Sequence, residues 1–323
     1  MPIRVGIIGC SSIARRRFLP ALISSDKAML QIVGSRDSSK AKNYSELFQC
    51  KEFGDYEEVI SSEAVDLVYI STPPTERKHL LEAAIRAGKH VLCEKPLLTD
   101  ADTTREILDL AQNYGIRLYE NYAYLSHPQH AKVIELLSKN IIGRIREVSV
   151  SYTYPLPAAH DIRLKPQLGG GVINDSLGYP VSLVIFLFDD AVKITRASIS
   201  HSNSLGVDKN CEFEAIVGEG VQYKARVGMD EEYSSTYVLT GEYGAIEVGR
   251  AFSVDSTHAA TIIINTASGR EVETIANANQ FQLYLDQCIV DLSDVRKLSE
   301  KNTLQIRSLM DAIIQAAKPI FNF

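Results

Sequence analysis

Residues 3–14 read Ile-Arg-Val-Gly-Ile-Ile-Gly-Cys-Ser-Ser-Ile-Ala, a short apolar run followed by small residues and then by helical spacing. Gly9-x-Ser11-x-x-Ala14 is a variant of the G-x-G-x-x-G/A pattern at the first βα turn of dinucleotide-binding units. Gly9 permits the tight turn, and the N–H groups after it can bind a pyrophosphate at the helix N-terminus. Ser11 replaces the second glycine, and its hydroxyl can donate to a phosphate. The pattern predicts a phosphate-binding turn, with an ordinary strand–helix turn as the alternative.

The first 120 residues alternate strand-like apolar runs with amphipathic helical stretches. Strands are expected at residues 3–8, 30–34, 65–71 and 90–93. Helices are expected at residues 14–24, 40–48, 76–87 and 100–114. Pro20 should kink or restart the first helix, Gly88 should end the third, and Asp100 should cap the fourth. This alternation indicates a doubly wound parallel sheet, so we expect a dinucleotide-binding Rossmann domain over residues 1–120.

The pattern changes after about residue 121. A helical stretch at 129–138 leads into an alternating strand at 145–154, and two helical stretches close the chain, ending with 303–317. Three hairpins are expected between them: 211–217 with 221–227, 235–240 with 245–248, and 261–265 with 271–275. We therefore expect residues 121–323 to form an α+β domain with a large, mainly antiparallel open sheet that serves substrate binding and oligomerisation.

The composition is that of an ordinary globular protein, with 45% hydrophobic and 23% charged residues. A length of 323 residues suggests two domains at about 150 residues each. The net charge is −6, and the sequence shows no local basic patch. Such a surface repels phosphate backbones, so we expect no nucleic-acid partner.

Membrane spans and export signals are also not expected. The longest strongly apolar run, residues 181–188, is far short of the roughly 20 residues that cross a bilayer. The N-terminus lacks a basic segment followed by an apolar one. The five cysteines are widely spaced and never form a CxxC pair: Cys10, Cys50, Cys93, Cys211 and Cys288. Reduced thiols of this kind indicate a cytoplasmic protein.

The end of the second predicted strand favours NADP(H) over NAD(H). An NAD-specific domain usually places an acidic residue there to bind the ribose 2′-hydroxyl. This chain has Ser35 and Arg36, with Lys40 one turn further on. A hydroxyl and a guanidinium suit a 2′-phosphate, because the guanidinium fork makes bidentate charge-assisted bonds. Asp37 is the feature against this interpretation, and a solvated loop charge is the alternative for Arg36.

The segment 88–97, Gly-Lys-His-Val-Leu-Cys-Glu-Lys-Pro-Leu, resembles the AGKHV-x-x-EKP signature of the GFO/IDH/MocA oxidoreductases. Further features match that family in the same order: the Gly9 turn, Ser71-Thr-Pro-Pro, Glu120-Asn-Tyr, and the glycine-rich stretch 169–180. Within the family, residues 121–130, 143–146, 161–163 and 169–179 look most like the NADP-dependent sugar-nucleotide ketoreductases of deoxysugar biosynthesis. The closest resemblance is to enzymes that reduce a C3 ketone on a nucleotide-linked hexose.

The resemblance also implies which residues bind the cofactor. They are Gly9, Ser11, Ser12, Ile13, Ser35, Arg36, Lys40, Ser71, Thr72, Pro73, His79, Glu94 and Lys95. It further implies that Asn121, Asp175 and Arg163 contact the substrate. Arg163 follows a proline-rich stretch and could meet a substrate diphosphate, although a solvated loop is an equal alternative.

The resemblance implies Lys95 and Tyr179 as the candidate catalytic residues, because Lys95 belongs to the EKP signature and the family pattern after the glycine-rich stretch is Asp-x-x-x-His or Asp-x-x-x-Tyr. Lys95 follows a strand end, so it should lie at the carboxyl edge of the parallel sheet, where such folds bind ligands. Asp175 and Tyr179 are four residues apart and share a helix face. Tyr179 would protonate the substrate oxyanion, while Lys95 would position the carbonyl and stabilise the phenolate; the reverse assignment stays open. Asp175 would bind a sugar hydroxyl or orient Lys95, and the alternative for Tyr179 is an ordinary packed aromatic.

A metal site is not expected. His127-Pro-Gln-His130 lacks the i, i+4 spacing of a zinc helix, and no third ligand is evident. The leading hypothesis is an NADPH-dependent reductase of a nucleotide-linked keto sugar that forms a homodimer or homotetramer. A dehydrogenase of a free sugar or polyol is the alternative of the same class. A dinucleotide-sensing regulator without catalysis is the alternative of another class.

Overall fold

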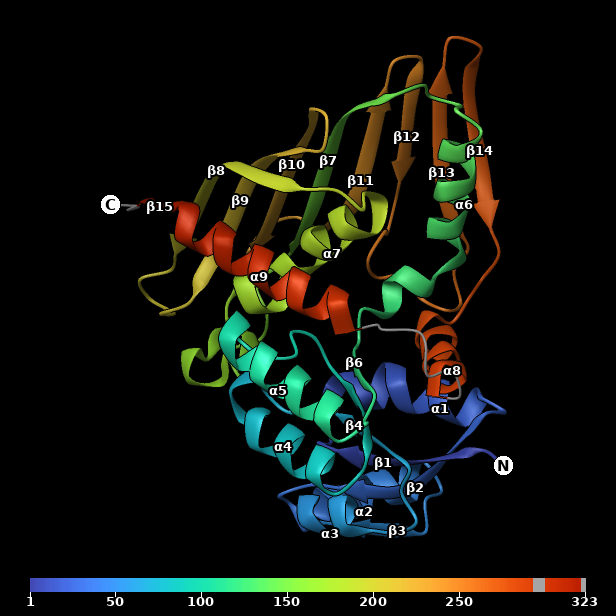
Figure 1. Ribbon diagram of the computed structural model, residues 1–323, viewed down its shortest axis with the longest axis vertical. Helices are drawn as coiled ribbons and strands as arrows, with labels where there is room; N and C mark the ends of the chain where they lie inside the picture. The colour runs from blue at the N-terminus through green and yellow to red at the C-terminus, as the bar shows by residue number, and fades with distance from the viewer. Residues whose placement is uncertain (293–299, 321–323) are drawn as a thin grey trace. The chain divides into compact units, whose positions relative to one another are not determined.

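The computed structural model describes residues 1–292 and 300–320, and the chain divides into two compact units (Figure 1). Unit 1 comprises Met1–Tyr122 and Phe281–Gln305, and unit 2 comprises Ala123–Gln280 and Ile306–Phe323. The sequence predicts a single domain boundary, between residues 120 and 121. The structure differs in that the chain returns to unit 1 for a helix late in the sequence, which local patterns do not reveal.

Within the described residues, unit 1 contains a six-stranded parallel sheet with the order β3-β2-β1-β4-β5-β6. Its strands are β1 Ile3–Ile8, β2 Ala28–Gly34, β3 Glu52–Gly54, β4 Leu67–Ile70, β5 His90–Cys93 and β6 Leu118–Glu120. The strand order reverses between β1 and β4, which is where doubly wound sheets bind ligands at the carboxyl ends of their strands. The predicted Rossmann sheet is therefore confirmed. Strands β3 and β6 escaped prediction because each has only three residues.

Helices pack on both faces of this sheet. They are η1 Ala14–Phe18, α1 Leu19–Ser24, α2 Ser38–Leu47, α3 Tyr56–Ser61, α4 Lys78–Arg86, α5 Ala101–Asn113 and α8 Gln280–Leu292. One apolar cluster joins the sheet to α3, α4 and α5, and another joins it to α1, α2 and α8. Strands buried on both faces read as continuous apolar runs, which is why β1, β4 and β5 were recognisable.

The predicted helix ends are confirmed. Gly88 has φ 76°, and the Asp100 carboxylate accepts a hydrogen bond from the Thr103 N–H at 2.8 Å. Pro20 is the second residue of α1, directly after the π-helical turn η1. A proline there costs little, because its missing N–H belongs to the first turn of a restarted α-helix.

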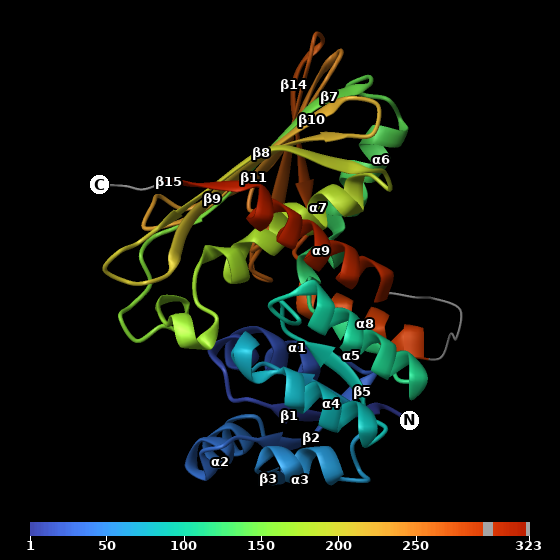
Figure 2. The ribbon, with the colours of Figure 1, turned by 60° about the vertical axis from the view of Figure 1, so that its left-hand side comes forward.

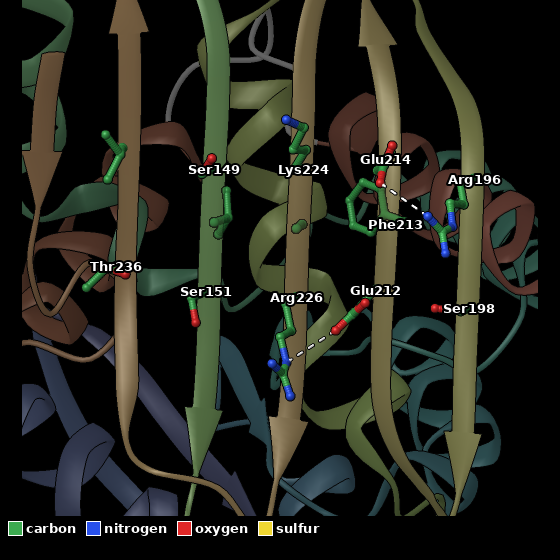
Figure 3. Close-up of a pocket in the computed structure, with 13 residues that line it drawn as sticks. Ser149, Ser151, Arg196, Ser198, Glu212, Phe213, Glu214, Lys224, Arg226 and Thr236 are labelled. Carbon is green, nitrogen blue, oxygen red and sulfur yellow. Dashed lines mark ion pairs between the residues drawn. The ribbon is translucent and has the colours of Figure 1, made fainter. Parts of the chain in front are cut away.

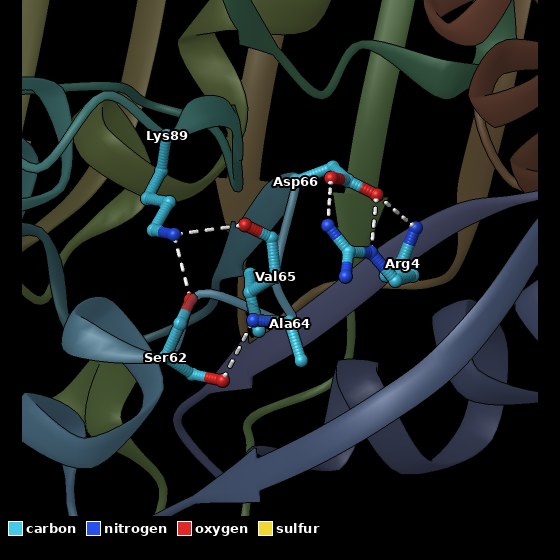
Figure 4. Close-up of polar contacts among 6 residues, drawn as sticks. All are labelled: Arg4, Ser62, Ala64, Val65, Asp66 and Lys89. Carbon is cyan, nitrogen blue, oxygen red and sulfur yellow. Dashed lines mark hydrogen bonds and ion pairs between the residues drawn. The ribbon is translucent and has the colours of Figure 1, made fainter.

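The amino ends of the strands are tied by buried and half-buried polar contacts (Figure 4). Asp66, which precedes β4, accepts hydrogen bonds from the backbone N–H and the guanidinium of Arg4 on β1. The Lys89 ammonium donates to the carbonyls of Ser62 and Val65 at 2.7 and 2.9 Å. The bond from Arg4 lowers the pKa of Asp66, and burial lowers the pKa of Lys89. These contacts brace the edge opposite to the phosphate-binding turn.

Within the described residues, unit 2 contains a nine-stranded sheet with the order β14-β13-β12-β11-β7-β10-β9-β8-β15. Its strands are β7 Ile145–Tyr154, β8 Val192–His201, β9 Asp208–Val217, β10 Val221–Met229, β11 Ser234–Gly241, β12 Gly244–Val248, β13 Ala260–Thr266, β14 Gly269–Ile275 and β15 Ala317–Ile320. The β7–β10 and β8–β15 pairs are parallel and the other described pairs are antiparallel. All three predicted hairpins are present, so the mainly antiparallel sheet is confirmed.

Helices of unit 2 include α6 Pro128–Ser138 and α7 Gly178–Leu187, and α9 Glu300–Ala316 belongs to unit 2 from Ile306 onward. Helix α7 packs on β7 and β10 (Figure 2), while α6 packs on β13 (Figure 1). The other face of the sheet carries serine, threonine and charged side chains around a shallow depression of about 330 Å³ (Figure 3). Cross-strand ion pairs lie on this face, among them Arg196–Glu214 at 3.9 Å and Arg226–Glu212 at 3.5 Å.

By length and composition alone, Pro166–Leu187 is the one described helical stretch long and apolar enough to cross a membrane. The share of its most apolar window buried inside the structure is 56%, as expected of a core helix. The stretch is also interrupted, because Gly169 and Gly171 adopt φ 78° and 101° and a π-helical turn, η6 Ile173–Leu177, precedes α7. The predicted apolar run 181–188 lies largely within α7.

The buried side chain of His130 joins α6 to the sheet of unit 2. The His130 ring nitrogens lie 3.1 Å from the Tyr237 hydroxyl and 3.0 Å from the Ala251 carbonyl oxygen. Gln129 donates to the same carbonyl at 3.1 Å. Burial lowers the pKa of His130 from 6.5 to about 3. The ring is therefore a neutral core residue, and no group of metal-ligating residues is found among those that the structure describes.

We expect the free energy of unfolding to fall as the pH drops below about 6.5, because the unfolded chain protonates His130 and the folded chain does not. This group alone should cost about 2 kcal/mol at pH 5 relative to about pH 8. His130→Asn should be less stable at the higher pH and should lose less on acidification. Urea unfolding at both pH values measures this, with the exposed His258→Asn as control. An unchanged pH dependence in His130→Asn would contradict the expectation.

Candidate functional site

The turn after β1 lies against the segment after β4. Gly9 has φ 99°, and a Cβ there would lie 3.2 Å from the backbone of Ser71 and Thr72. The Gly9 N–H donates to the Gly34 carbonyl at 3.1 Å, which joins the turn to the end of β2. Only glycine satisfies both the positive φ and this close approach. The carboxyl ends of β1, β2 and β4 therefore meet at one place, as a dinucleotide site requires.

Ser11 connects this turn to the helix behind it. Its Oγ accepts a hydrogen bond from the Ala14 N–H at 3.1 Å and donates to Ser71 Oγ at 2.8 Å. Ser71 Oγ in turn donates to the Gly9 carbonyl at 2.7 Å. Ser12 and Ile13 form the first helical residues after Ser11. The Ser11 hydroxyl thus caps the helix and shapes the turn, a role that the phosphate-binding pattern alone did not indicate.

The segment after β2 carries the groups expected to select the cofactor. Asp37 caps α2, accepting from the N–H groups of Ser39 and Lys40 at 3.0 and 3.2 Å. The hydrogen bond from the Ser39 hydroxyl lowers the pKa of Asp37. Ser35 is buried, and its Oγ accepts from the Asp37 N–H at 3.2 Å. Asp37, the residue that argued against NADP, therefore uses its carboxylate as a helix cap.

The Arg36 side chain is 67% exposed and contacts the Glu76 carboxylate at 3.0 Å. Lys40 lies in the first turn of α2, also exposed. His79, from the first turn of α4, is exposed as well. Arg36 therefore stands just after β2 with an exposed side chain that is ion-paired with Glu76.

Arg77 is a buried cation that the sequence analysis did not single out. Its side chain is 4% exposed, and its Nε donates to the Thr72 carbonyl at 2.9 Å. Its Nη1 donates to the carbonyls of Glu94 and Pro96. One guanidinium therefore binds the segments after β4 and β5 together, and it braces Lys95 from both sides. The local sequence does not predict this role, because an arginine between a loop and a helix is usually exposed.

Glu94 and Asn121, predicted for cofactor and substrate respectively, contact each other. Glu94 is 6% exposed, and its Oε1 accepts from Asn121 Nδ2 at 2.6 Å and from the Tyr69 hydroxyl at 2.7 Å. Lys95 follows the carboxyl end of β5 and is half-buried, and the Lys95–Pro96 peptide is cis. The Glu94 carboxylate thus joins the end of β5, where Lys95 lies, to the side chains of Tyr69 on β4 and Asn121 after β6.

The carboxyl edge of this sheet fits a dinucleotide. Thr72 Oγ1 is buried without a hydrogen-bond partner among the described residues, and the Cγ2 of the same side chain would lie 3.2 Å from a Cβ on Gly9. Pro73, the next residue, begins the 3-10 turn η2 Pro74–Glu76 that leads to Arg77. A polar group of the cofactor can satisfy such a hydroxyl, whereas an empty structural turn would leave it unpaired.

Tyr179 belongs to unit 2 and lies within a cluster of aromatic rings. Its ring centroid is 4.8 Å from that of Tyr152, 5.3 Å from Phe252 and 5.6 Å from Tyr124. The Tyr124 hydroxyl donates to the Tyr179 carbonyl at 3.2 Å. Tilted and edge-on contacts of this kind hold a ring in one orientation. The sequence analysis identified Tyr179 but none of the three rings around it, because they come from distant segments.

Asp175 and Arg163, predicted as separate substrate contacts, form an ion pair. Arg163 Nε lies 2.9 Å from Asp175 Oδ2, and Nη1 donates to Asp161 Oδ2 at 3.0 Å. The Tyr154 hydroxyl also donates to Asp175 Oδ2, at 3.0 Å. The charge of Asp175 raises the pKa of Arg163. Two carboxylates therefore neutralise the guanidinium that was expected to meet a diphosphate.

Two family models match the chain. Residues 3–122 match the oxidoreductase family with an NAD-binding Rossmann fold, GFO_IDH_MocA, and residues 130–247 match the GFO/IDH/MocA C-terminal domain. The chain is 31% identical over 323 residues to the dTDP-3,4-didehydro-2,6-dideoxy-alpha-D-glucose 3-reductase of Actinomadura kijaniata, covering 99% of this chain and 97% of the relative. It is also 27% identical to the D-xylose 1-dehydrogenase (NADP(+)) 2 of Haloferax volcanii, covering 97% of each.

A crystal structure of a 3-ketoreductase from Actinomadura kijaniata, in complex with NADP and TDP-benzene, superimposes with a TM-score of 0.95. The two chains are 30% identical, and the match covers 100% of both. Solved structures of that enzyme include variants in which one lysine is replaced by alanine or glutamate and one tyrosine by phenylalanine.

Proposed function

This chain belongs to the GFO/IDH/MocA oxidoreductase family, and we propose that it reduces the C3 ketone of a nucleotide-linked keto-deoxyhexose with NADPH. The observation that carries the proposal is the similarity, along nearly the whole chain, to a 3-reductase whose substrate is a dTDP-linked dideoxyhexose. The structural relative that holds both NADP and a TDP compound supports the same substrate class. The sugar is therefore proposed to be joined to thymidine diphosphate.

The cofactor is NADP(H), and the carboxyl edge of the unit 1 sheet is its site. When bound, NADPH supplies the hydride. Gly9 and the helix that Ser11 caps offer backbone N–H groups to the pyrophosphate. Arg36 and Ser35 offer charge-assisted hydrogen bonds to the 2′-phosphate, and Asp37 does not oppose them because its carboxylate is bound to the start of α2.

Tyr179 and Lys95 are the proposed catalytic pair. Tyr179 donates its hydroxyl proton to the ketone oxygen, and the Lys95 ammonium orients that oxygen and stabilises the phenolate left behind. Each residue is held by its own surroundings: Arg77 braces the backbone around Lys95, and the rings of Tyr124, Tyr152 and Phe252 hold Tyr179. Rigid placement of both groups lowers the entropy cost of reaching the reactive geometry.

We infer that Asp175 holds its surroundings in place in addition to contacting the sugar. Its carboxylate is shared between Arg163 and Tyr154, so it fixes the loop before the glycine-rich turn onto the helix that carries Tyr179. The remaining acceptor capacity of that carboxylate is available for a sugar hydroxyl. Asn121, held by Glu94, is proposed to contact the substrate as well.

The open face of the unit 2 sheet is the surface that we propose for assembly into a homodimer or homotetramer. Its side chains carry both signs of charge, as in the Lys224–Glu147 pair at 2.5 Å. A two-fold contact places a mixed-charge surface against itself without net repulsion. A cytoplasmic location is proposed from the five cysteines, which are all unpaired and of which four are buried.

Oxidation of a free sugar is the second candidate function, and the D-xylose dehydrogenase among the relatives favours it. A free sugar lacks the diphosphate, so it offers less binding energy remote from the reacting carbon. The two functions therefore differ in how strongly turnover depends on the nucleotide.

We expect kcat/KM for a dTDP-linked 3-keto-deoxyhexose to exceed that for the matching free sugar by at least about 100-fold, or about 2.7 kcal/mol. Part of the loss should appear in kcat, because the nucleotide helps to orient the ketone. NADPH consumption with each sugar measures both constants. Comparable rates, or faster oxidation of free sugars with NADP⁺, would support the dehydrogenase instead. Tight NADPH binding without turnover of either sugar would indicate a dinucleotide sensor.

Arg36→Ala should weaken NADPH binding by about 1.5–3 kcal/mol, the range for hydrogen bonds to charged groups, and should leave NADH binding nearly unchanged. The matched control is Arg105→Ala, which removes an exposed arginine that pairs with Asp102 on α5. Titration calorimetry with both cofactors measures the difference. Equal losses for NADPH and NADH would show that Arg36 does not recognise the 2′-phosphate.

Lys95→Ala and Tyr179→Phe should each lower kcat by about 10²–10⁴-fold while NADPH affinity is kept, because a positioned proton donor contributes that much. Lys139→Ala and Tyr243→Phe change exposed residues of the same types and serve as controls. Steady-state kinetics at saturating NADPH gives the comparison. A tolerated Tyr179→Phe would make Lys95 the acid, and near-normal turnover in Lys95→Met would remove the lysine from the mechanism.

A further inference from the structure

Asp208, the first residue of β9, reaches the start of the helix that carries Asp175 and Tyr179. Its Oδ2 accepts a hydrogen bond from the Ile173 N–H at 2.6 Å. Its other oxygen, Oδ1, lies only 2.2 Å from where a Cβ on Gly171 would stand. The carboxylate therefore occupies the space above the helix N-terminus, in which a side chain at Gly171 would collide with it.

The helix needs such a partner, because the first N–H groups of a helix have no acceptor within it. Val172, the residue at the N-cap position, makes no side-chain cap bond, and the π-helical turn η6 begins directly after it. A carboxylate at this end also interacts favourably with the helix dipole. Burial raises the pKa of Asp208, whereas the bonds from Ile173 and Val172 lower it. Asp208 thus acts as a cap supplied from a strand more than thirty residues further along the chain.

The glycine-rich turn is held from its other side as well. The Gly171 N–H donates to the Arg163 carbonyl at 2.9 Å, and a Cβ on Gly170 would lie 2.6 Å from that carbonyl oxygen. The turn therefore fits between the loop that carries Arg163 and the Asp208 carboxylate. These two contacts together fix the position of the helix start. The orientation of the Asp175 and Tyr179 side chains depends on that position.

We propose that Asp208 is a positioning residue for the reaction, which fixes the start of the helical segment 172–187 and thereby places Asp175 and Tyr179. The inference rests on the proposed function for its kinetic consequence, but the contact itself does not depend on it. Asp208 touches neither substrate nor cofactor in this proposal. It acts through the backbone of residues 171–173.

The test compares Asp208→Ala with Asp190→Ala. The first removes the oxygen that accepts from the Ile173 N–H, which an asparagine would keep. The second is a matched control, because an Asp190 oxygen also lies 2.2 Å from where a Cβ on Gly218 would stand, and its carboxylate accepts from the Ala191 N–H at 2.7 Å. Asp190 lies in a loop after α7 that carries no predicted site residue. Asp208→Glu, which keeps the charge, is the rescue variant.

Two readouts are needed. Hydrogen exchange of the peptide over residues 171–179 should be at least about 10-fold faster in Asp208→Ala than in the wild type. At saturating NADPH and well below the melting temperature, kcat should fall at least about 10-fold while the NADPH Kd stays within about twofold. Asp190→Ala should change neither quantity, and Asp208→Glu should lie between Asp208→Ala and the wild type in both.

The outcomes separate this inference from the proposed function. Unchanged exchange in Asp208→Ala would overturn the cap, and faster exchange with unchanged kcat would overturn the positioning role. Should Asp208→Ala not fold, Gly171→Ala, whose Cβ would displace the Asp208 carboxylate, provides the same two measurements, with wild-type values in both overturning the proposal. A wild-type enzyme that turns over no keto sugar would defeat the proposed function, and the exchange result would then decide the inference alone.

Discussion

The close approach of the Gly9 turn to the segment after β4 governs the cofactor half of the molecule. No side chain fits between them, since a Cβ on Gly9 would stand 3.2 Å from the Ser71 and Thr72 backbone. The hydrogen bonds among Gly9, Ser11 and Ser71 keep that distance. Three strand ends consequently converge on one surface of backbone N–H groups, on which a pyrophosphate can bind without a dedicated basic residue.

The buried charged side chains beside that surface, Arg77 and Glu94, are both bound by hydrogen-bond partners. Arg77 lies among the carbonyls of Thr72, Glu94 and Pro96, and Glu94 accepts from Asn121 and Tyr69. A buried ion without such partners would cost several kcal/mol. The bonds also immobilise the segment around Lys95. Stability and catalytic geometry therefore rest on the same contacts, so loss of Arg77 would disturb both together.

In unit 2 the charged residues Asp161, Arg163 and Asp175 form ion pairs with one another. Arg163 lies between Asp161 and Asp175, and Asp175 also holds the Tyr154 hydroxyl. This network changes the interpretation of Arg163, which as an isolated loop cation looked suited to a diphosphate. Paired in this way, it fastens the proline-rich loop to the helix behind the glycine turn. Recognition of a phosphate would then require another donor or a rearrangement of the ion pair.

The sequence by itself determined what depends on neighbours along the chain. The strand periodicity of β1 and β7, the three hairpins, the turn at Gly9 and the helix ends at Gly88 and Asp100 follow from local sterics and burial, which act over a few residues. Only the tertiary structure decided the contacts between distant segments: Arg77 with the carbonyls after β5, the rings around Tyr179, Asp208 above the helix start, and the return of α8 to unit 1. The spacing of residues along the chain does not predict these partners, because each contact depends on where a different strand or helix lies once the sheets have formed.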